Sequence, residues 1–399
     1  MLKKIPFILL ILVIFTFFVG DFLPLFVLRG FLAISITLKS AIMFVLPALI
    51  FCLLFSTFQR LGSNASRVVL ITLIVLCCSN FSATYISHFV GKFVHSSMQL
   101  SPINILKNST LSPLFDWQLP KTIPNTLAMI LGVLGGIFAP KIAGKNFQKL
   151  SRTMDMIVAR LLEGISLIIP LFLFGFLLKM QHDRLIILLI RQYAKIVVVI
   201  VASLAVYLSF FFLLANGMRI KQTIACIKNM IPPLICAFGS MSSASALPYT
   251  IVAVEKNATN KPLAKSVVSL TTNVHLMGDC IAIPIFVYAI LKSYGFPQPS
   301  EVLYLIFTLQ FVIAKFSVAA VPGGGIIVML PIIERCFGFD GAMSSLIFSL
   351  YVLLDPICTS ANVLGNGALA QLIDRIIGQF ELENGTKQRK KHHKIGAKN

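Results

Sequence analysis

The sequence predicts an all-α membrane protein with eight transmembrane helices and two oppositely oriented re-entrant helical hairpins. Three observations predict this class. Of the 399 residues, 57% are hydrophobic and 12% are charged, whereas soluble domains carry about 25% charged residues. Eight apolar stretches are each long enough to cross a hydrocarbon core of about 30 Å as a helix. Two further apolar regions are interrupted by small residues and proline, which divides each into two half-length arms.

The eight apolar stretches follow one another along the chain. They cover 5–28, 33–58, 67–95, 123–141, 155–180, 185–216, 267–291 and 342–378. The first stretch follows "MLKK" and lacks a small-x-small cleavage site, so we interpret it as a spanning helix rather than a signal peptide. Residues 96–122 are predicted to form an extended outer loop.

Basic residues mark alternate connecting segments. The tail "KQRKKHHKIGAKN" and the loop "KIAGKNFQKLSR" are rich in Lys and Arg, whereas the intervening segments are not. Cytoplasmic loops carry such an excess, so both termini are predicted in the cytoplasm, with the chain in a bacterial inner membrane. This placement accounts for the net charge of +20 without a nucleic-acid partner. The eight cysteines show no spacing typical of zinc or of a disulfide framework.

The two interrupted regions predict re-entrant hairpins that enter the bilayer from opposite sides. Region 229–254 contains "SMSSASALP", and both its ends adjoin segments placed in the cytoplasm. Region 302–333 contains "AAVPGGG", and both its ends face outward. Transporters with inverted repeats place substrate at the midplane, where such broken helices meet. Continuous spanning helices with Gly or Pro kinks are the alternative.

A span with a polar patch follows each predicted hairpin. The same 32-residue offset separates Ser243 from His275 and Gly323 from Asp355. Helix N-termini at the hairpin tips attract carboxylates, and Asp355 supplies a negative charge nearby. A pocket with these two ends is suited to an amino acid. The alternative for Asp355 is an ion pair with an intramembrane lysine such as Lys315, because an unpaired charge at the bilayer centre costs at least a few kcal/mol.

These motifs resemble those of the dicarboxylate/amino acid:cation symporters, a family that includes glutamate transporters and neutral amino-acid exchangers. The resemblance rests on "LDPICTSANVLGNG", "AAVPGGG", "SSASALP" and "FVLPALIFCLLFSTFQRLG", and it covers almost the whole chain. It implies glutamate-transporter-like inverted repeats, a homotrimer in the lipid bilayer, and an elevator mechanism in which a mobile transport domain carries substrate past a fixed scaffold.

The resemblance also implies a division of the chain into domains. The divisions are 1–65 for scaffold spans one and two, 66–95 for span three of the transport domain, 96–184 for the outer loop and scaffold spans four and five, 185–378 for the remaining transport domain (span six, first hairpin, span seven, second hairpin, span eight), and 379–399 for a basic cytoplasmic tail.

Substrate-binding residues follow from the resemblance position by position. Asp355 and Thr359 correspond to the ligands of the substrate amino group, and Asn362 to the side chain that binds the main carboxylate. The full implied set is Ser242, Ser243, Val321, Gly323, Asp355, Cys358, Thr359 and Asn362. Members with acidic substrates carry an arginine where this chain has Cys358, and that arginine holds the second carboxylate as a bidentate pair. A neutral amino acid is therefore the predicted substrate, and sodium- or proton-coupled symport of glutamate, aspartate or a dicarboxylate is the alternative.

The positions of the family's cation ligands are altered. Met277 and Asn366 stand where the family has aspartates, and Cys78 stands where it has a threonine, although Ser79 matches. These losses predict reduced sodium coupling. No cofactor is predicted beyond a sodium ion or a proton as coupling ion, and Asn362 and Asn366 are the candidate ligands of a weak sodium site.

Three ionisable residues offer other routes to coupling. His275 and Asp279 would share a face of an unbroken helix, where the pair could carry a proton; capping of a broken helix is the alternative. Lys315, in the second hairpin, could act as a cation tethered to the protein. The candidate cation-coupling residues are thus His275, Asp279, Asn366, Ser79 and Lys315.

Two other functional classes were compared with a transporter. An intramembrane enzyme could use Ser243, His275 and Asp279, but the sequence has no nucleophile elbow or spacing that supports a triad, so no enzymatic activity is predicted. A non-transporting channel or scaffold, produced by loss of the cation sites, is the second alternative.

Overall fold

The computed structural model of the chain is helical over most of the residues that it describes. These are residues 8, 11–12, 15–16, 18–63, 67–98, 111–120, 123–142, 146–182, 185–318 and 323–396, and no β-strand occurs among them. The helices of at least three residues are η2 Gly20–Phe22, α2 Leu25–Ser63, α3 Arg67–Ser97, α4 Asn125–Ile142, α5 Asn146–His182, α6 Leu185–Ala215, α7 Ile220–Asn229, α8 Ile231–Ser240, α9 Ser243–Asn257, α10 Lys261–Thr271, α11 Met277–Ser293, α12 Glu301–Ala314, η3 Lys315–Ser317, α13 Gly324–Phe337 and α14 Gly341–Gly396.

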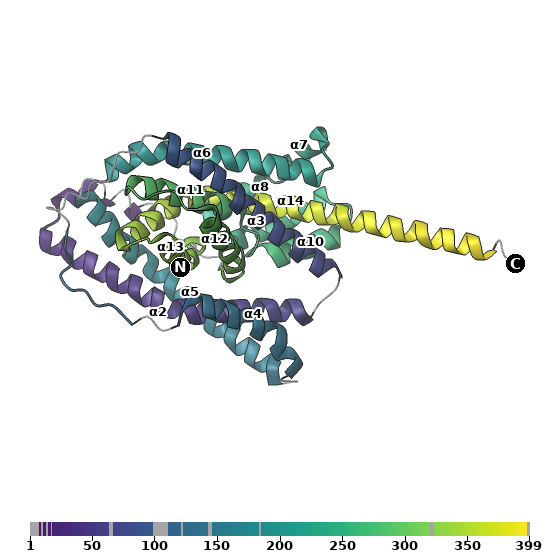
Figure 1. The fold of residues 1–399 in the computed structure, drawn as a ribbon, viewed down its shortest axis with the longest axis horizontal. Coiled ribbons are helices and arrows are strands. Elements are labelled where there is room, and N and C mark those ends of the chain that lie inside the picture. Colours follow the sequence, from purple (N-terminus) through teal and green to yellow (C-terminus); the bar gives the residue numbers. More distant parts are fainter. Residues whose placement is uncertain are drawn as a thin grey trace.

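The helices form two groups. Helices α4 and α5 both pack on α2, along the lower side of the view in Figure 1. The second group is built around α11 and α14, with α3 and α6 against α11 and with α8, α9 and α10 against α14. The C-terminal part of α14 extends away from the rest of the molecule (Figure 1), because this helix continues to Gly396, beyond the predicted end of the last span at residue 378.

Several described helices are long and apolar enough to cross a membrane. Among the described residues these are four segments: Leu25–Ser56, Val68–Ser97, Tyr193–Ala215 and Gly341–Gln379. Helices α7 and α8 meet at a bend of 44° and would add a fifth as one broken span. By length and composition the chain is therefore a multi-pass membrane protein.

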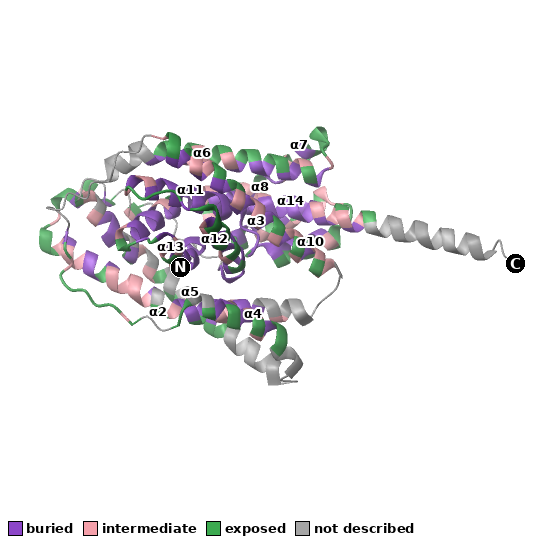
Figure 2. Ribbon diagram, viewed as in Figure 1, coloured by how far each residue is buried: buried purple, intermediate pink, exposed green. Residues whose placement is uncertain are grey.

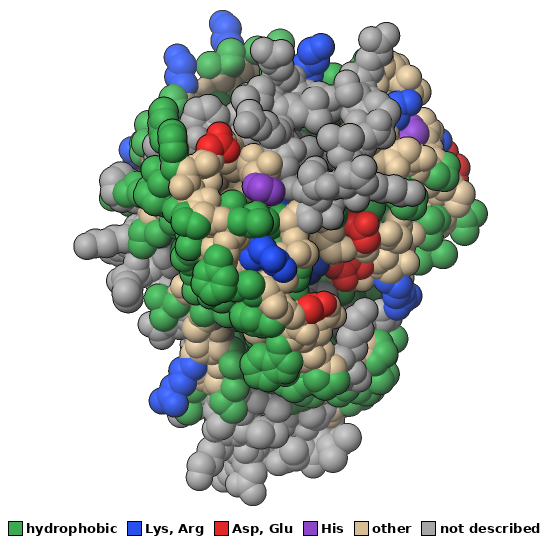
Figure 3. Space-filling model, turned by 90° about the vertical axis from the view of Figure 1, so that its left-hand side faces the viewer, with side chains coloured by type: hydrophobic (Ala, Val, Ile, Leu, Met, Phe, Trp, Pro, Cys, Tyr) green, Lys and Arg blue, Asp and Glu red, His purple; other side chains and the backbone are tan. Residues whose placement is uncertain are grey.

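The outer surface of the molecule is rich in large apolar side chains. Phe22, Phe26 and Val206 are 85%, 72% and 72% exposed. In the end view of Figure 3, hydrophobic side chains lie along the flanks, and several charged side chains lie nearer the middle of the face. Apolar patches of this extent indicate contact with lipid or with another protein.

Helix α11 is the most deeply enclosed element. Every residue from Met277 to Ser293 is buried except Lys292, and Figure 2 shows buried residues concentrated in the helices around α11. A helix that is apolar on all sides needs neighbours on all sides. The neighbouring helices therefore bury and fix the polar side chain in the first turn of α11, that of Asp279.

Two boundaries predicted from the sequence are wrong. The break between the first two predicted spans was expected at residues 29–32, but helix α2 begins at Leu25, after η2 and Pro24. Proline lacks an N–H and favours a helix start, whereas residues 29–32 are compatible with a continuous helix. The predicted span 267–291 is also not one helix, because α10 ends at Thr271 and α11 begins at Met277.

The break between α10 and α11 is held by asparagine side chains from other helices. Asn80 of α3 donates to the carbonyl of Val274 over 2.9 Å, and Asn366 of α14 donates to the carbonyl of His275 over 3.1 Å. Backbone groups freed at membrane depth need such partners within the protein. The sequence within the break does not reveal these partners, which explains why the sequence leaves both an unbroken and a broken helix open.

Candidate substrate and cation site

Segments far apart in the sequence meet at a narrow cavity of about 30 Å³. They are the turn between α8 and α9, the break between α10 and α11, the start of α13 and the middle of α14. The lining residues are Met241, Ser242, Ser243, Thr272, Asn273, Leu276, Asp279, Val318, Gly325, Tyr351, Asp355, Thr359 and Asn362. A cavity of this size has room for water molecules rather than for an amino acid, so a larger ligand could enter only if the segments around it separated.

Three helices begin at this cavity. Met241 ends α8 in the left-handed conformation, with φ 48°, and the Ser242 side chain then accepts from the amide of Ser245 at the start of α9. Helix α11 begins at Met277 and α13 at Gly324. Because helix N-termini carry partial positive charge, they stabilise acceptor groups such as the carboxylate of Asp355, which accepts from the amide of Gly323.

Asp355 lies in α14 and connects this helix to the start of α13. Its Oδ1 accepts from the hydroxyl of Thr359 over 2.8 Å, and its Oδ2 accepts from the amide of Gly323 over 2.9 Å. Gly323 has φ +71°, a conformation that glycine adopts without strain. The carboxylate is 4% exposed, and both its oxygens are held by the protein.

Asp279 and Lys315 form a buried ion pair beside this carboxylate. The ammonium Nζ lies 2.9 Å from Oδ2 of Asp279, and the two side chains are 0% and 2% exposed. The other oxygen, Oδ1, accepts from the hydroxyl of Tyr351 over 2.8 Å and from the amide of Asn362 over 3.1 Å. The predicted alternative in which Lys315 pairs with Asp355 is therefore wrong, because Asp279 holds the ammonium.

The sequence leaves two interpretations of His275 and Asp279 open. The pair on an unbroken helix is wrong, whereas the helix is broken as the alternative required. The expectation assumed an unbroken helix, whereas His275 lies in the break and Asp279 in the first turn of α11. Nε2 of His275 hydrogen-bonds the hydroxyl of Ser79 over 2.9 Å, and its buried Nδ1 has no partner. The structure thus brings Ser79 and His275 together on the α3 side of the break, away from the Asp279–Lys315 pair.

Asn362 and Asn366 use their side chains to position the break. Oδ1 of Asn362 accepts from the amide of Gly278 over 2.7 Å. Oδ1 of Asn366 accepts from the hydroxyl of Thr271 over 2.7 Å, and its amide donates to the carbonyls of His275 and Asn362. Both candidate sodium-binding oxygens therefore accept hydrogen bonds from the protein.

Two glycines allow the close approach of these groups. A Cβ on Gly278 would overlap the backbone carbonyl of Cys358, and a Cβ on Gly325 would overlap the carboxylate of Asp279. Cys358 is fully buried against this contact and lies outside the cavity lining. Val321 lies outside the described residues. Sequence reasoning missed Tyr351, although its position four residues before Asp355 places both on one face of α14.

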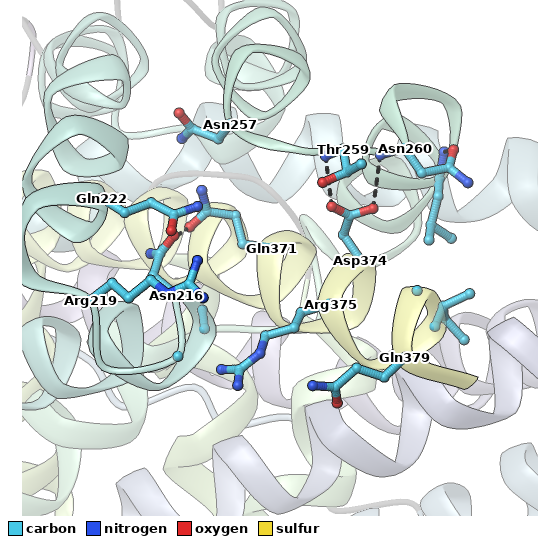
Figure 4. Close-up of a pocket in the computed structure, with 15 residues that line it drawn as sticks. Asn216, Arg219, Gln222, Asn257, Thr259, Asn260, Gln371, Asp374, Arg375 and Gln379 are labelled. Carbon is cyan, nitrogen blue, oxygen red and sulfur yellow. Dashed lines mark hydrogen bonds between the residues drawn. The ribbon is translucent and has the colours of Figure 1, made fainter. Parts of the chain in front are cut away.

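A larger cavity of about 470 Å³ lies elsewhere, between the ends of α6 and α9 and the C-terminal part of α14 (Figure 4). Asp374 accepts from the amides of Thr259 and Asn260 over 2.8 and 3.0 Å. The next residue, Arg375, donates to the carbonyl of Leu214 over 3.0 Å. These contacts fasten α14 to α6 and to the start of α10, and no predicted site residue lines this cavity.

The pattern that defines the sodium:dicarboxylate symporter family matches residues 5–376. The chain belongs to this family. The match covers nearly the whole chain and confirms the resemblance inferred from the motifs. The family is described as one of symporters, and symporters are secondary transporters.

Individual relatives match shorter segments. The proton/sodium-glutamate symport protein of Geobacillus stearothermophilus is 25% identical over 198 residues, which is 48% of this chain and 45% of the relative. A protein of Caenorhabditis elegans named as a sodium-dependent excitatory amino acid transporter, glt-6, is 24% identical over 160 residues, which is 39% of this chain and 29% of the relative. The chain thus spans less than half the length of each of these relatives.

Proposed function

We propose that this protein is a secondary active transporter of neutral amino acids with reduced sodium coupling. Asp355 carries the proposal, because it is a buried carboxylate at the cavity wall beside the start of α13. A substrate ammonium would take the place of the Gly323 amide at Oδ2, while Thr359 keeps the other oxygen in position. The substrate carboxylate would then face the start of α9 at Ser242 and Ser243.

The choice of a neutral substrate depends on which basic side chains near the cavity could bind a second substrate carboxylate. Among the described residues, Lys315 is the one buried lysine or arginine, and its ammonium is bound to Asp279. Met241 and Cys358 supply no charge. A second carboxylate on the substrate would therefore lose its water without gaining a cationic partner, which is unfavourable. Glutamate, which the name of the Geobacillus relative gives as its substrate, is the competing candidate.

Reduced sodium coupling is proposed because the oxygens that could bind sodium in this region already have other partners or roles. Asp279 and Asp355 are the buried acids among the described residues. Asp279 has Lys315 as its partner, and Asp355 is assigned to the substrate. The oxygens of Asn362 and Asn366 accept hydrogen bonds from the protein, so a weak sodium site there would require them to exchange partners.

The transport movement is proposed to be an elevator in a homotrimer, with eight spans, two re-entrant hairpins and both termini in the cytoplasm of a bacterial inner membrane. The helix lengths support the hairpins. Helix α8 has 10 residues and α9 has 15, which is about 15 and 22 Å of helix and less than a full hydrocarbon core. Helices α2, α4 and α5, packed as one group, supply the proposed scaffold.

Purified protein can test this function in two steps. A thermal-shift screen of the twenty amino acids, with and without sodium, should show stabilisation by alanine, serine or threonine. Counterflow of the same amino acid in proteoliposomes should then separate a transporter from a channel or a non-transporting scaffold. Tight binding of aspartate, glutamate or succinate without a response to neutral amino acids would contradict the proposed substrate.

A further inference from the structure

The ammonium of Lys315 occupies a cation site that is built by several elements. Asp279 of α11 supplies the charged oxygen at 2.9 Å, and the ring of Phe311 in α12 lies beneath the ammonium, with its centroid at 4.4 Å. The partner carboxylate is itself fixed by Tyr351 and Asn362 of α14. A carboxylate together with an aromatic face is a suitable environment for a desolvated monovalent cation.

The location of this site connects it to transport. Lys315 lies in η3, directly after α12 and before the predicted tip of the second hairpin. Asp279 lies in the first turn of α11, just after the break between α10 and α11. Gly325, the second residue of α13, leaves the space that the Asp279 carboxylate fills. The site therefore lies between two interrupted helices, and interrupted helices are where secondary transporters coordinate their coupling cations.

A cation that is covalently part of the protein cannot diffuse away from its site, unlike a dissolved ion. Lys315 is joined to the protein, so its effective concentration at Asp279 stays high whatever the composition of the solution. A solvent cation can bind only if it displaces this ammonium. The ammonium also cannot leave with the substrate, so it cannot link substrate movement to an ion gradient.

We infer that Asp279 forms a monovalent-cation subsite that is filled permanently by Lys315. Binding of a dissolved ion at this subsite therefore cannot be coupled to movement of the substrate, and the protein exchanges amino acids across the membrane without sodium. The exchange part of this inference rests on the proposed amino-acid transport, whereas the cation-binding part does not. Removal of the lysine side chain should open the subsite to a small cation such as sodium or methylammonium.

The full-length protein with Lys315→Ala tests the cation-binding part. Thermal melting is followed in choline chloride, with sodium chloride or methylammonium chloride exchanged in at constant ionic strength. We expect a saturable rise in melting temperature for Lys315→Ala and none for the unaltered protein. Lys292→Ala, at the far end of α11, is the matched control and should give no cation response.

A double variant separates binding at Asp279 from general salt effects. Lys315→Ala combined with Asp279→Asn removes both charges, so its melting temperature should not respond to either cation. An equal response in the single and double variants would overturn the cation subsite. A saturable sodium response of the unaltered protein that Asp279→Asn abolishes would overturn the permanent occupancy.

Exchange is measured on the unaltered protein and so does not depend on the folding of a variant. Proteoliposomes preloaded with an accepted amino acid should take up labelled amino acid at rates that agree within about twofold in sodium and in choline buffers. A fall of tenfold or more in choline would overturn the inference. If no amino acid shifts the melting temperature or exchanges in either buffer, the proposed function fails instead, and the cation measurements still decide the subsite.

Discussion

Replacing Asp355 with asparagine removes one negative charge from the cavity while leaving the shape of the side chain almost unchanged. The carboxylate accepts from Thr359 and from the Gly323 amide. Asparagine has one acceptor oxygen, so it can keep one of these bonds but not both. In the substrate complex it also lacks the charge that attracts the ammonium.

The expected magnitude follows from these contacts. A hydrogen bond to a charged group contributes about 1.5–3 kcal/mol, and each 1.4 kcal/mol corresponds to a factor of ten in affinity. Loss of one such bond to the substrate ammonium should therefore weaken binding by about 10- to 140-fold. The fold should be less affected, because the variant also avoids the cost of burying a charge.

Titration of the accepted amino acid measures this loss, with melting temperature and oligomer size as controls for folding. Asp340→Asn is a matched control, because Asp340 is exposed and accepts from the amides of Ala342 and Met343 at the start of α14. Asparagine is an equally good cap at such a position. Normal binding and uptake by a folded Asp355→Asn protein would refute the assignment of Asp355 to the substrate.

Three further predictions concern specificity, packing and pH. Cys358 is fully buried and lies outside the cavity lining, so Cys358→Arg should lower the melting temperature. If the variant folds with its guanidinium at the cavity, binding of aspartate relative to alanine should rise about tenfold or more, because a charge-assisted bond contributes about 1.5–3 kcal/mol. Unchanged relative affinities in a folded variant would contradict a role in specificity. Gly325→Ala should lower the free energy of unfolding by about 1–3 kcal/mol, because its methyl group would overlap the carboxylate of Asp279; chemical denaturation measures this loss, and a stability equal to that of the parent would count against the packing. Glu301 precedes the second hairpin, and a hydrogen bond from Lys92 lowers the pKa of its carboxyl group below the ordinary value. The stability that this lowered pKa contributes is present above the pKa of the Glu301 carboxyl group in the unfolded chain, and it is lost as the pH falls through the lower pKa in the folded protein. Acid should therefore reduce the melting temperature less in Glu301→Gln than in the parent.

The sequence predicted those features that depend on neighbouring residues. Small residues and proline marked both interruptions in the hairpin regions, and α8, α9, α12 and α13 are separate helices there. The resemblance grouped Asp355 with Thr359, and the two residues lie four positions apart in α14, where they hydrogen-bond. Such local patterns fix the helical period without any tertiary information.

Features that depend on distant residues could not be predicted in this way. The break between α10 and α11 exists because Asn80 and Asn366 supply hydrogen bonds from other helices. The sequence offered Asp355 as a partner for Lys315, and only the tertiary fold shows that Asp279 of α11 holds the ammonium. The close approach of α11 to α14 at Gly278 likewise depends on the tertiary fold.

The convergence of α9, α11 and α13 on one cavity has a consequence for how this protein can change over time. The N–H groups at a helix start belong to the backbone, so no substitution other than proline removes them. Attraction for a carboxylate is therefore inherited with the fold, while the side chains around it are free to vary. For the proposed transporter, mutational drift at these side chains would alter the tolerated cation and the accepted substrate side chain long before it abolished recognition of a substrate carboxylate.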